Sequence, residues 1–180
     1  MSTRPTTAEL FIDELRREGE ITRRFIGRMP EDKLGWRAHE KSHPVGTLAF
    51  HIANLPDGIT AMAMAGVMPL DNVGDFFTKP ASKQQILDAL NQGLVVAEER
   101  LSKMSDADFE QTWTATLGGK PVMSMTRRDV IRQILFSHTT HHRGQLGVYL
   151  RLIGVPVPSA YGPSADEMPP FLADAMKSMR

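Results

Sequence analysis

Three of the chain's six histidines fall within five residues, between His138 and His142. His138 and His142 are four positions apart, so a helix places both rings on one face, with about 5–6 Å between their Cβ atoms. Two imidazoles at this spacing can bind one metal ion. His141 would lie about 60° from His138, on the side away from His142. We therefore expect His141 to flank the pair.

The face that carries this pair is predicted to be buried. A titratable ring in a core must be satisfied by hydrogen bonds to carbonyl groups or water, or by a metal. His51 also lies on a predicted apolar helix face, between Leu48 and Leu55, and would complete a set of three ligands from two helices. Around the pair, apolar residues repeat at the helical period, at Ile131, Ile134, Leu135, Leu146, Tyr149 and Ile153.

The two remaining histidines, His39 and His43, lie in a segment bounded by Pro30 and Pro44 and are expected to be solvated. The chain contains no cysteine, so a metal site must use histidine, carboxylate or water.

The charge balance and the pattern of apolar residues argue against nucleic-acid and membrane partners. Lys+Arg and Asp+Glu are equal at 21 each, so no overall charge attracts nucleic acid. The N-terminal residues lack the apolar stretch of a signal peptide, and no apolar run reaches the roughly 18 residues that span a bilayer. The lack of cysteine fits a reducing compartment. We expect a cytoplasmic protein that binds neither nucleic acid nor membrane.

Apolar periodicity and capping residues predict four long helices, over residues 6–27, 45–65, 82–103 and 126–153. Pro56 falls inside the second helix and is expected to kink it, which could displace the His51 ring. Residues 105–109 predict a short helical turn, and residues 112–117, before two glycines, predict a short strand or a small hairpin. Residues 66–80 are expected to be a long connection.

These elements predict an all-α single domain over residues 1–180, built as a four-helix bundle. The connections after the first and second helices are long enough to cross the bundle, so the order of the helices stays open. The segment beyond residue 153 contains several prolines. We expect it to form an irregular C-terminal tail across the bundle, with a last helical turn or two over 172–179.

Several motifs follow one another along the chain. They are Leu48-Ala-Phe-His51-Ile-Ala, then His138-Thr-Thr-His141-His142-Arg-Gly-Gln145-Leu, then Tyr149-Leu-Arg-Leu-Ile-Gly154-Val-Pro156, and the tail Pro158-Ser-Ala-Tyr161-Gly-Pro-Ser-Ala-Asp166-Glu. In order and spacing the chain resembles the DinB/YfiT-like superfamily over essentially its whole length. The resemblance implies a bundle with up-down-down-up connections, a homodimer, and a divalent metal held by three histidines, which map onto His51, His138 and His142.

Three neutral imidazoles on one divalent ion leave at least one coordination position open, as in catalytic sites. Such a site can lower the pKa of a bound water towards ~7 or activate a thiolate. Because the chain has no cysteine, the thiol would be an external low-molecular-weight cosubstrate. Members of the superfamily include transferases and isomerases that use mycothiol or bacillithiol. Our first hypothesis is a metal-dependent thiol S-transferase or hydrolase.

Three residues are candidates for a catalytic role. Gln145 lies close to His138 in helical phase and could orient substrate or a water, or could only make a hydrogen bond between helices. Tyr161 and Asp166 could reach the metal if the tail folds back, or could lie on the surface. Arg143 is expected to face outward or into a dimer interface.

Two other functions stay open. One is a non-catalytic, stress-associated module that binds a metal or a small ligand. The other is a dimeric structural bundle whose histidines are only hydrogen-bonded core residues. Imidazole ligands suit several metals, with zinc or nickel expected first and iron, manganese or copper as further candidates. The substrate is not defined by the sequence.

Overall fold

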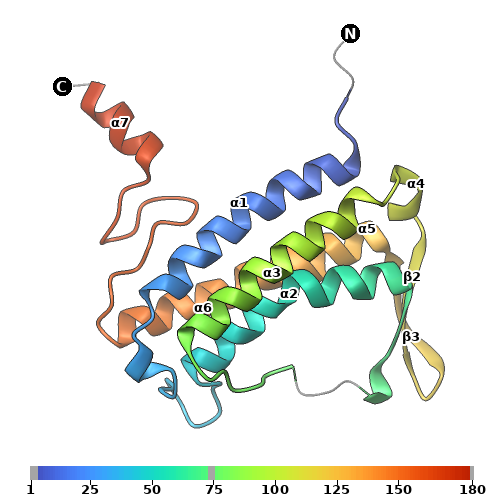
Figure 1. Cartoon of the computed structure of the whole chain (residues 1–180), viewed down its shortest axis with the longest axis horizontal. Helices are drawn as coiled ribbons and strands as arrows, with labels where there is room; N and C mark the ends of the chain where they lie inside the picture. The colour runs from blue at the N-terminus through green and yellow to red at the C-terminus, as the bar shows by residue number, and fades with distance from the viewer. Residues whose placement is uncertain (1–3, 73–75, 179–180) are drawn as a thin grey trace.

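The computed structural model describes residues 4–72 and 76–178 of the chain. It is mostly helical, with a small three-stranded sheet at one end of the long helices (Figure 1). Three long helices are α1 (Thr7–Arg28), α2 (Val45–Ala65) and α3 (Lys83–Ser102), and a fourth helical run covers α5 (Arg127–Asp129), η3 (Val130–Ser137) and α6 (His138–Leu152). Each long segment that the sequence predicted is therefore helical.

Capping residues start the first and third long helices where the sequence predicted. The Thr6 and Glu9 pair before α1 forms a reciprocal capping box. Before α3, the Ser82 hydroxyl accepts a hydrogen bond from the Gln85 N–H at 3.1 Å. The Gln85 side chain, however, accepts from the N–H of Ala81 at 2.6 Å rather than from Ser82. Ser82 thus caps the start of α3, and the return bond of the Gln85 side chain is made one residue earlier, to Ala81.

Shorter elements join the long helices. The predicted turn over 105–109 is α4 (Asp106–Phe109), and the predicted last helix is α7 (Pro170–Ser178), which ends the tail away from the long helices (Figure 1). Residue 179 lies outside the described residues, as do residues 73–75 of the predicted connection over 66–80. Two 3₁₀ turns, η1 (Glu31–Lys33) and η2 (Leu70–Asn72), lie in the connections on either side of α2.

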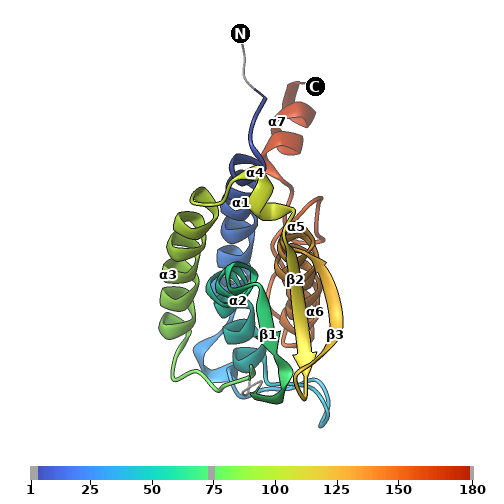
Figure 2. The ribbon, with the colours of Figure 1, turned by 90° about the vertical axis from the view of Figure 1, so that its right-hand side faces the viewer.

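The structure confirms a mostly helical fold and adds a small sheet to the all-α prediction. Strands β2 (Thr112–Leu117) and β3 (Lys120–Thr126) form the hairpin that the sequence allowed. Gly118 and Gly119 form its turn, with φ of 56° and 72°, and two positive φ angles are what a tight hairpin turn requires. Strand β1 (Val67–Pro69) pairs in parallel with β2 and was not predicted. With three residues, β1 is too short to show the alternation of apolar and polar residues that predicts a strand. The sheet stands beside α2 (Figure 2).

The fourth helical run is not a uniform α-helix. Residues 130–137 form the π-helix η3, where hydrogen bonds reach back five residues, as from the N–H of His138 to the carbonyl of Gln133. π segments are rare and are frequently found at functional sites. This one ends directly at His138, the first residue of α6. The change of pitch also buries Phe136, which the 3.6-residue pattern did not assign to the core.

Arg143 is buried, which makes its expected outward position wrong. Its side chain is 2% exposed and pairs with the carboxylate of Glu18 on α1. It also donates to the hydroxyl of Thr22 at 2.9 Å. The Tyr161 hydroxyl, from the tail, donates to the same Glu18 carboxylate at 2.7 Å. This position of α6 faces α1, and the carboxylate compensates the buried cation. The network fixes the tail against both helices.

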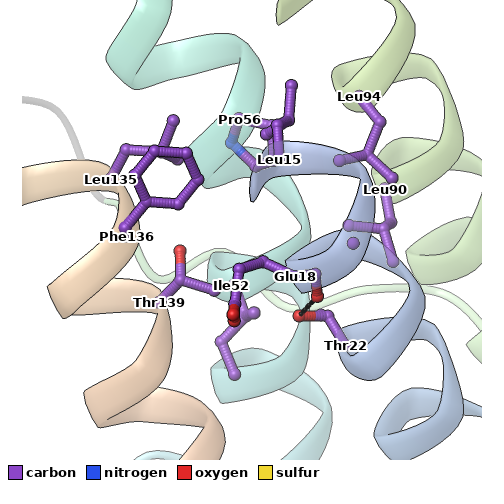
Figure 3. Close-up of a pocket in the computed structure, with 11 residues that line it drawn as sticks. Leu15, Glu18, Thr22, Ile52, Pro56, Leu90, Leu94, Leu135, Phe136 and Thr139 are labelled. Carbon is purple, nitrogen blue, oxygen red and sulfur yellow. Dashed lines mark hydrogen bonds between the residues drawn. The ribbon is translucent and has the colours of Figure 1, made fainter. Parts of the chain in front are cut away.

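A small cavity lies where α1, α2, α3 and the fourth helical run meet (Figure 3). Its volume is about 10 Å³, and Pro56, Thr22 and Thr139 are among its lining residues. The helix α2 continues through Pro56 without a break. The Thr22 hydroxyl donates to the Glu18 carbonyl at 2.8 Å, whereas the buried Thr139 hydroxyl has no hydrogen-bond partner among the described residues. No helix within the described ranges is both long and apolar enough to cross a membrane.

These two hydroxyls give opposite predictions for the same isosteric change. Thr139→Val removes an unpaired buried hydroxyl and is expected to raise the free energy of unfolding by up to about 1 kcal/mol. Thr22→Val leaves Arg143 short of an acceptor and is expected to lower it by about 1–3 kcal/mol. Denaturant unfolding of the metal-free variants measures both. Equal destabilisation would mean that the Thr139 hydroxyl is paired after all.

Candidate metal centre

The structure brings the three predicted histidines together. His51 projects from the middle of α2, and His138 and His142 project from the first and second turns of α6. One ligand nitrogen from each ring lies within 4.8 Å of the others. The Nε2 atoms of His138 and His142 are 2.7 Å apart. The three side chains therefore form a cluster that could hold a metal ion, as expected from the sequence.

Hydrogen bonds at the opposite ring nitrogens fix which nitrogen faces the cluster. The Nδ1 of His51 donates to the Phe76 carbonyl at 3.1 Å, and the Nδ1 of His142 donates to the side-chain Oε1 of Gln145 at 2.7 Å. A carbonyl oxygen can only accept, so each Nδ1 carries the proton. The Nε2 atoms of His51 and His142 then present lone pairs to the cluster.

Three converging lone pairs are unfavourable unless something positive lies between them. The Nε2 of His51 is buried and has no hydrogen-bond partner among the described residues. The Nε2 atoms of His138 and His142 are 2.7 Å apart, and this contact requires a proton or a cation between their lone pairs. A divalent cation would satisfy all three nitrogens together. The donor set of three neutral imidazoles therefore fits a metal such as zinc or nickel.

Burial keeps these rings neutral. It lowers the pKa of His51 and of His138 below the ordinary value, and it lowers the pKa of His142 to about 4. The positive charge that each neighbouring ring would carry lowers them further. Because a metal binds the unprotonated nitrogen, a low pKa removes the competing proton at neutral pH.

The connection before α3 covers the cluster, and the sequence did not predict this. The ring of Phe77 stacks on His51 at 4.2 Å between centroids, and its other face stacks on His43 at 3.7 Å. Phe77 also lies edge-on to His142. His43 is thus an exposed ring held against the site by an aromatic neighbour. No periodicity marks Phe76 and Phe77 in the sequence, since they lie in an irregular segment.

The remaining histidines lie outside the ligand set. His141 is exposed, with its ring 5.0 Å from that of His142, so it flanks the pair. His39 is also exposed, and its Nδ1 accepts from the N–H of Lys41 at 3.2 Å.

Of the three catalytic candidates, only Gln145 contacts a histidine of the cluster in the described part of the chain. Its Oε1 holds the His142 ring. Tyr161 contacts Glu18, Arg143 and, at 3.1 Å, the hydroxyl of Thr140. Asp166 pairs with Arg151 and accepts from the N–H of Val157 at 2.8 Å. Both tail residues thus fasten the tail to the helices.

One side of the cluster opens on a cleft of about 750 Å³ between α2, the sheet and η3, with His51 and His138 among its lining residues. This is within the usual size of small-molecule sites. The open side of the cluster is therefore large enough for a substrate.

The fold and the site define a mostly helical protein with a three-histidine cluster that could bind a metal between α2 and α6. The DinB family model matches residues 1–173. The chain therefore belongs to the DinB family.

Its relatives are consistent with this assignment. It is 23% identical over 172 residues to "Uncharacterized protein YrdA" of Bacillus subtilis (strain 168). The alignment covers 95% of this chain and 98% of YrdA. The crystal structure of a DinB-like protein from Bacillus cereus ATCC 10987 has a TM-score of 0.65 at 22% identity, covering 84% of this chain and 95% of that one. The DinB-like protein YjoA from Bacillus subtilis has a TM-score of 0.63 at 14% identity, covering 88% and 98%. At these identities the two structures show a common fold.

Gln145→Ala is expected to weaken metal affinity by about tenfold, the lower end of what loss of a ligand's hydrogen-bonding partner produces, because this amide is exposed. Gln145→Glu keeps an acceptor for the His142 Nδ1 and should retain the affinity. Competition with a fluorescent chelator measures both, with Gln84→Ala on α3 as the control. An unchanged affinity in Gln145→Ala would contradict a role for this bond.

The lowered pKa values also predict how metal-free protein responds to acid. Unfolded histidines take up protons near their ordinary pKa of 6.5, whereas folded His142 resists protonation until its pKa of about 4. The unfolded state then binds more protons, so stability should fall as the pH falls from about 6.5 towards about 4. Thermal unfolding across this range should show a shallower decline in His142→Asn. An equal decline in stability in both proteins would contradict a lowered pKa at His142.

Proposed function

We propose that this DinB protein binds one divalent metal ion through the Nε2 atoms of His51, His138 and His142, and that it is a metal-dependent enzyme of the thiol S-transferase or hydrolase type. The convergence of three histidine nitrogens beside a cleft is the observation that supports this proposal most directly. When bound, the metal would lower the pKa of a water or activate an incoming thiol.

The chain's own side chains would prepare this site. Gln145 and the Phe76 carbonyl hold the His142 and His51 rings with their Nε2 atoms inward. Phe77 covers one face of His51 and limits access of water from that side. Since the chain contains no cysteine, any thiol would arrive as a cosubstrate.

Zinc or nickel is our first proposal for the metal, because imidazole ligands suit both. The alternatives are iron and copper, which imidazole also suits, and manganese, which it suits less well. We further propose a homodimer of four-helix bundles with up-down-down-up connections, as the family resemblance implies. A single copy of the chain supplies all three histidines of the cluster, so the cluster does not require a second copy.

A non-catalytic module that binds a metal or a small ligand is the second candidate. The observation in its favour is that the described residues lining the cleft include no aspartate or glutamate to serve as a general base. An enzyme with this lining would depend on the metal for its nucleophile.

Two measurements separate these candidates. Elemental analysis of protein purified without a polyhistidine tag should give about one metal per chain, and no metal would overturn the proposal. A panel of thiols with electrophiles, and of simple esters and amides, should then give turnover that His142→Ala abolishes. His141→Ala, at the flanking ring, is the matched control and should keep both metal and turnover. Full metal content with no turnover across the panel would favour the binding module.

A further inference from the structure

The cleft beside the histidine cluster has walls of uniform character. Helix α2 provides one wall, strands β1, β2 and β3 a second, and Ile134 of η3 borders His138. Among the described residues that line it, no side chain is acidic or basic apart from the two histidines. Asn54 and Thr78 are the other polar side chains. Apart from the two histidines, the described lining of this cleft of about 750 Å³ provides no partner for a charged group deep inside it.

The apolar groups of this lining are suited to contact with a ligand. Met62, Met68 and Met123 contribute flexible thioether chains, which adapt to varied shapes. The Trp113 N–H is already donated to the Met62 carbonyl at 3.1 Å, so its ring contributes apolar surface. Val67 and Phe76, which also line the cleft, are each 54% exposed. Apolar surface gathered around a concave site commonly marks a binding site.

We propose that this cleft binds the uncharged, apolar part of a substrate whose polar head lies at the histidine cluster, so that chain length and lack of charge determine its selection. This inference rests on the proposed metal site for the head group and on the lining for the rest. Two ligand histidines lie in the same cleft as the apolar walls, which favours one small molecule that contacts both. A carboxylate or a sugar in the apolar part would lose its hydration without gaining a partner.

Gly58 offers a way to test the cleft without touching the ligands. It lies on α2 among the lining residues, and a Cβ added there meets nothing within 4 Å. Gly58→Leu would place a side chain in the open cleft and would also favour the helix. Gly27 on α1 is likewise exposed with nothing within 4 Å, and it lies outside the cleft lining. Gly27→Leu is therefore the matched control.

The probes are straight-chain alkyl hydroxamic acids, from acetohydroxamic to octanohydroxamic acid, titrated by calorimetry into the zinc-loaded full chain. The hydroxamate coordinates the metal and the alkyl chain enters the cleft. Affinity should rise by about threefold to fourfold for each added methylene group, as expected for burial of apolar surface. A terminal carboxylate on the longest chain should weaken binding at least tenfold. In Gly58→Leu the gain with chain length should largely disappear, and in Gly27→Leu it should persist.

The metal-free protein provides a separate readout. An uncharged apolar dye, N-phenyl-1-naphthylamine, should gain fluorescence on binding to the metal-free chain, less so in Gly58→Leu and equally in Gly27→Leu. If the chain takes up no metal but the dye result holds, the proposed function fails and the apolar cleft stands.

Two results would overturn this inference. The first is metal-loaded protein that binds every hydroxamate equally, with no dye binding. The second is a dimer that dissociates in Gly58→Leu while the hydroxamates again bind equally, which would mean that a second copy of the chain covers the cleft.

Discussion

Three imidazole nitrogens are held within 4.8 Å of one another, and the local structure depends on keeping them there. In water such rings would rotate apart or take up a proton. Here hydrogen bonds at the opposite nitrogens, from His51 to Phe76 and from His142 to Gln145, prevent rotation. Burial opposes protonation by lowering the pKa of each ring. The arrangement is therefore preorganised for a cation. The packing of α2 against α6 offsets the unfavourable energy of holding the three nitrogens close together.

The helix that supplies two of the three clustered histidines is fixed from its other side by a buried ion pair. Arg143 follows His142 directly and points towards α1. There it pairs with the Glu18 carboxylate and donates hydrogen bonds to the Glu18 carbonyl and the Thr22 hydroxyl. Since neighbouring residues on a helix point about 100° apart, one turn of α6 serves both the histidine cluster and this network. Tyr161 ties the tail to the same carboxylate. A displacement of α6 that separated the histidines would also break a buried charge pair, which is strongly unfavourable. The tail residues thus act on the position of α6 rather than on the cluster directly.

The sequence predicted the parts of this site that follow from local periodicity. The four-residue spacing of His138 and His142 places two rings together on any α-helix, and the apolar neighbours of His51 select it as the third. The long helices followed from the same periodicity and from their caps. The π-helix η3 did not, because its residues have ordinary helical preferences and its pitch depends on packing. Strand β1 and the contacts of Phe77 were also missed, since each depends on a partner distant in the sequence. Arg143 was misplaced because its charge suggested solvent and its partners on α1, Glu18 and Thr22, lie more than a hundred residues away.

The chemistry and the selectivity of this site rest on different parts of the fold. The clustered histidines come from α2 and α6, whose positions are set by the two hydrophobic cores. Much of the cleft wall comes from the short sheet, whose hairpin turn and outer strand face solvent and do not contribute to the cluster. Residues of β1 and β3 can therefore change size or polarity without moving a ligand nitrogen, whereas a change on the buried face of α2 cannot. For this reason the three histidines alone would not determine the substrate, and the walls that the sheet provides would decide which molecule reaches the metal.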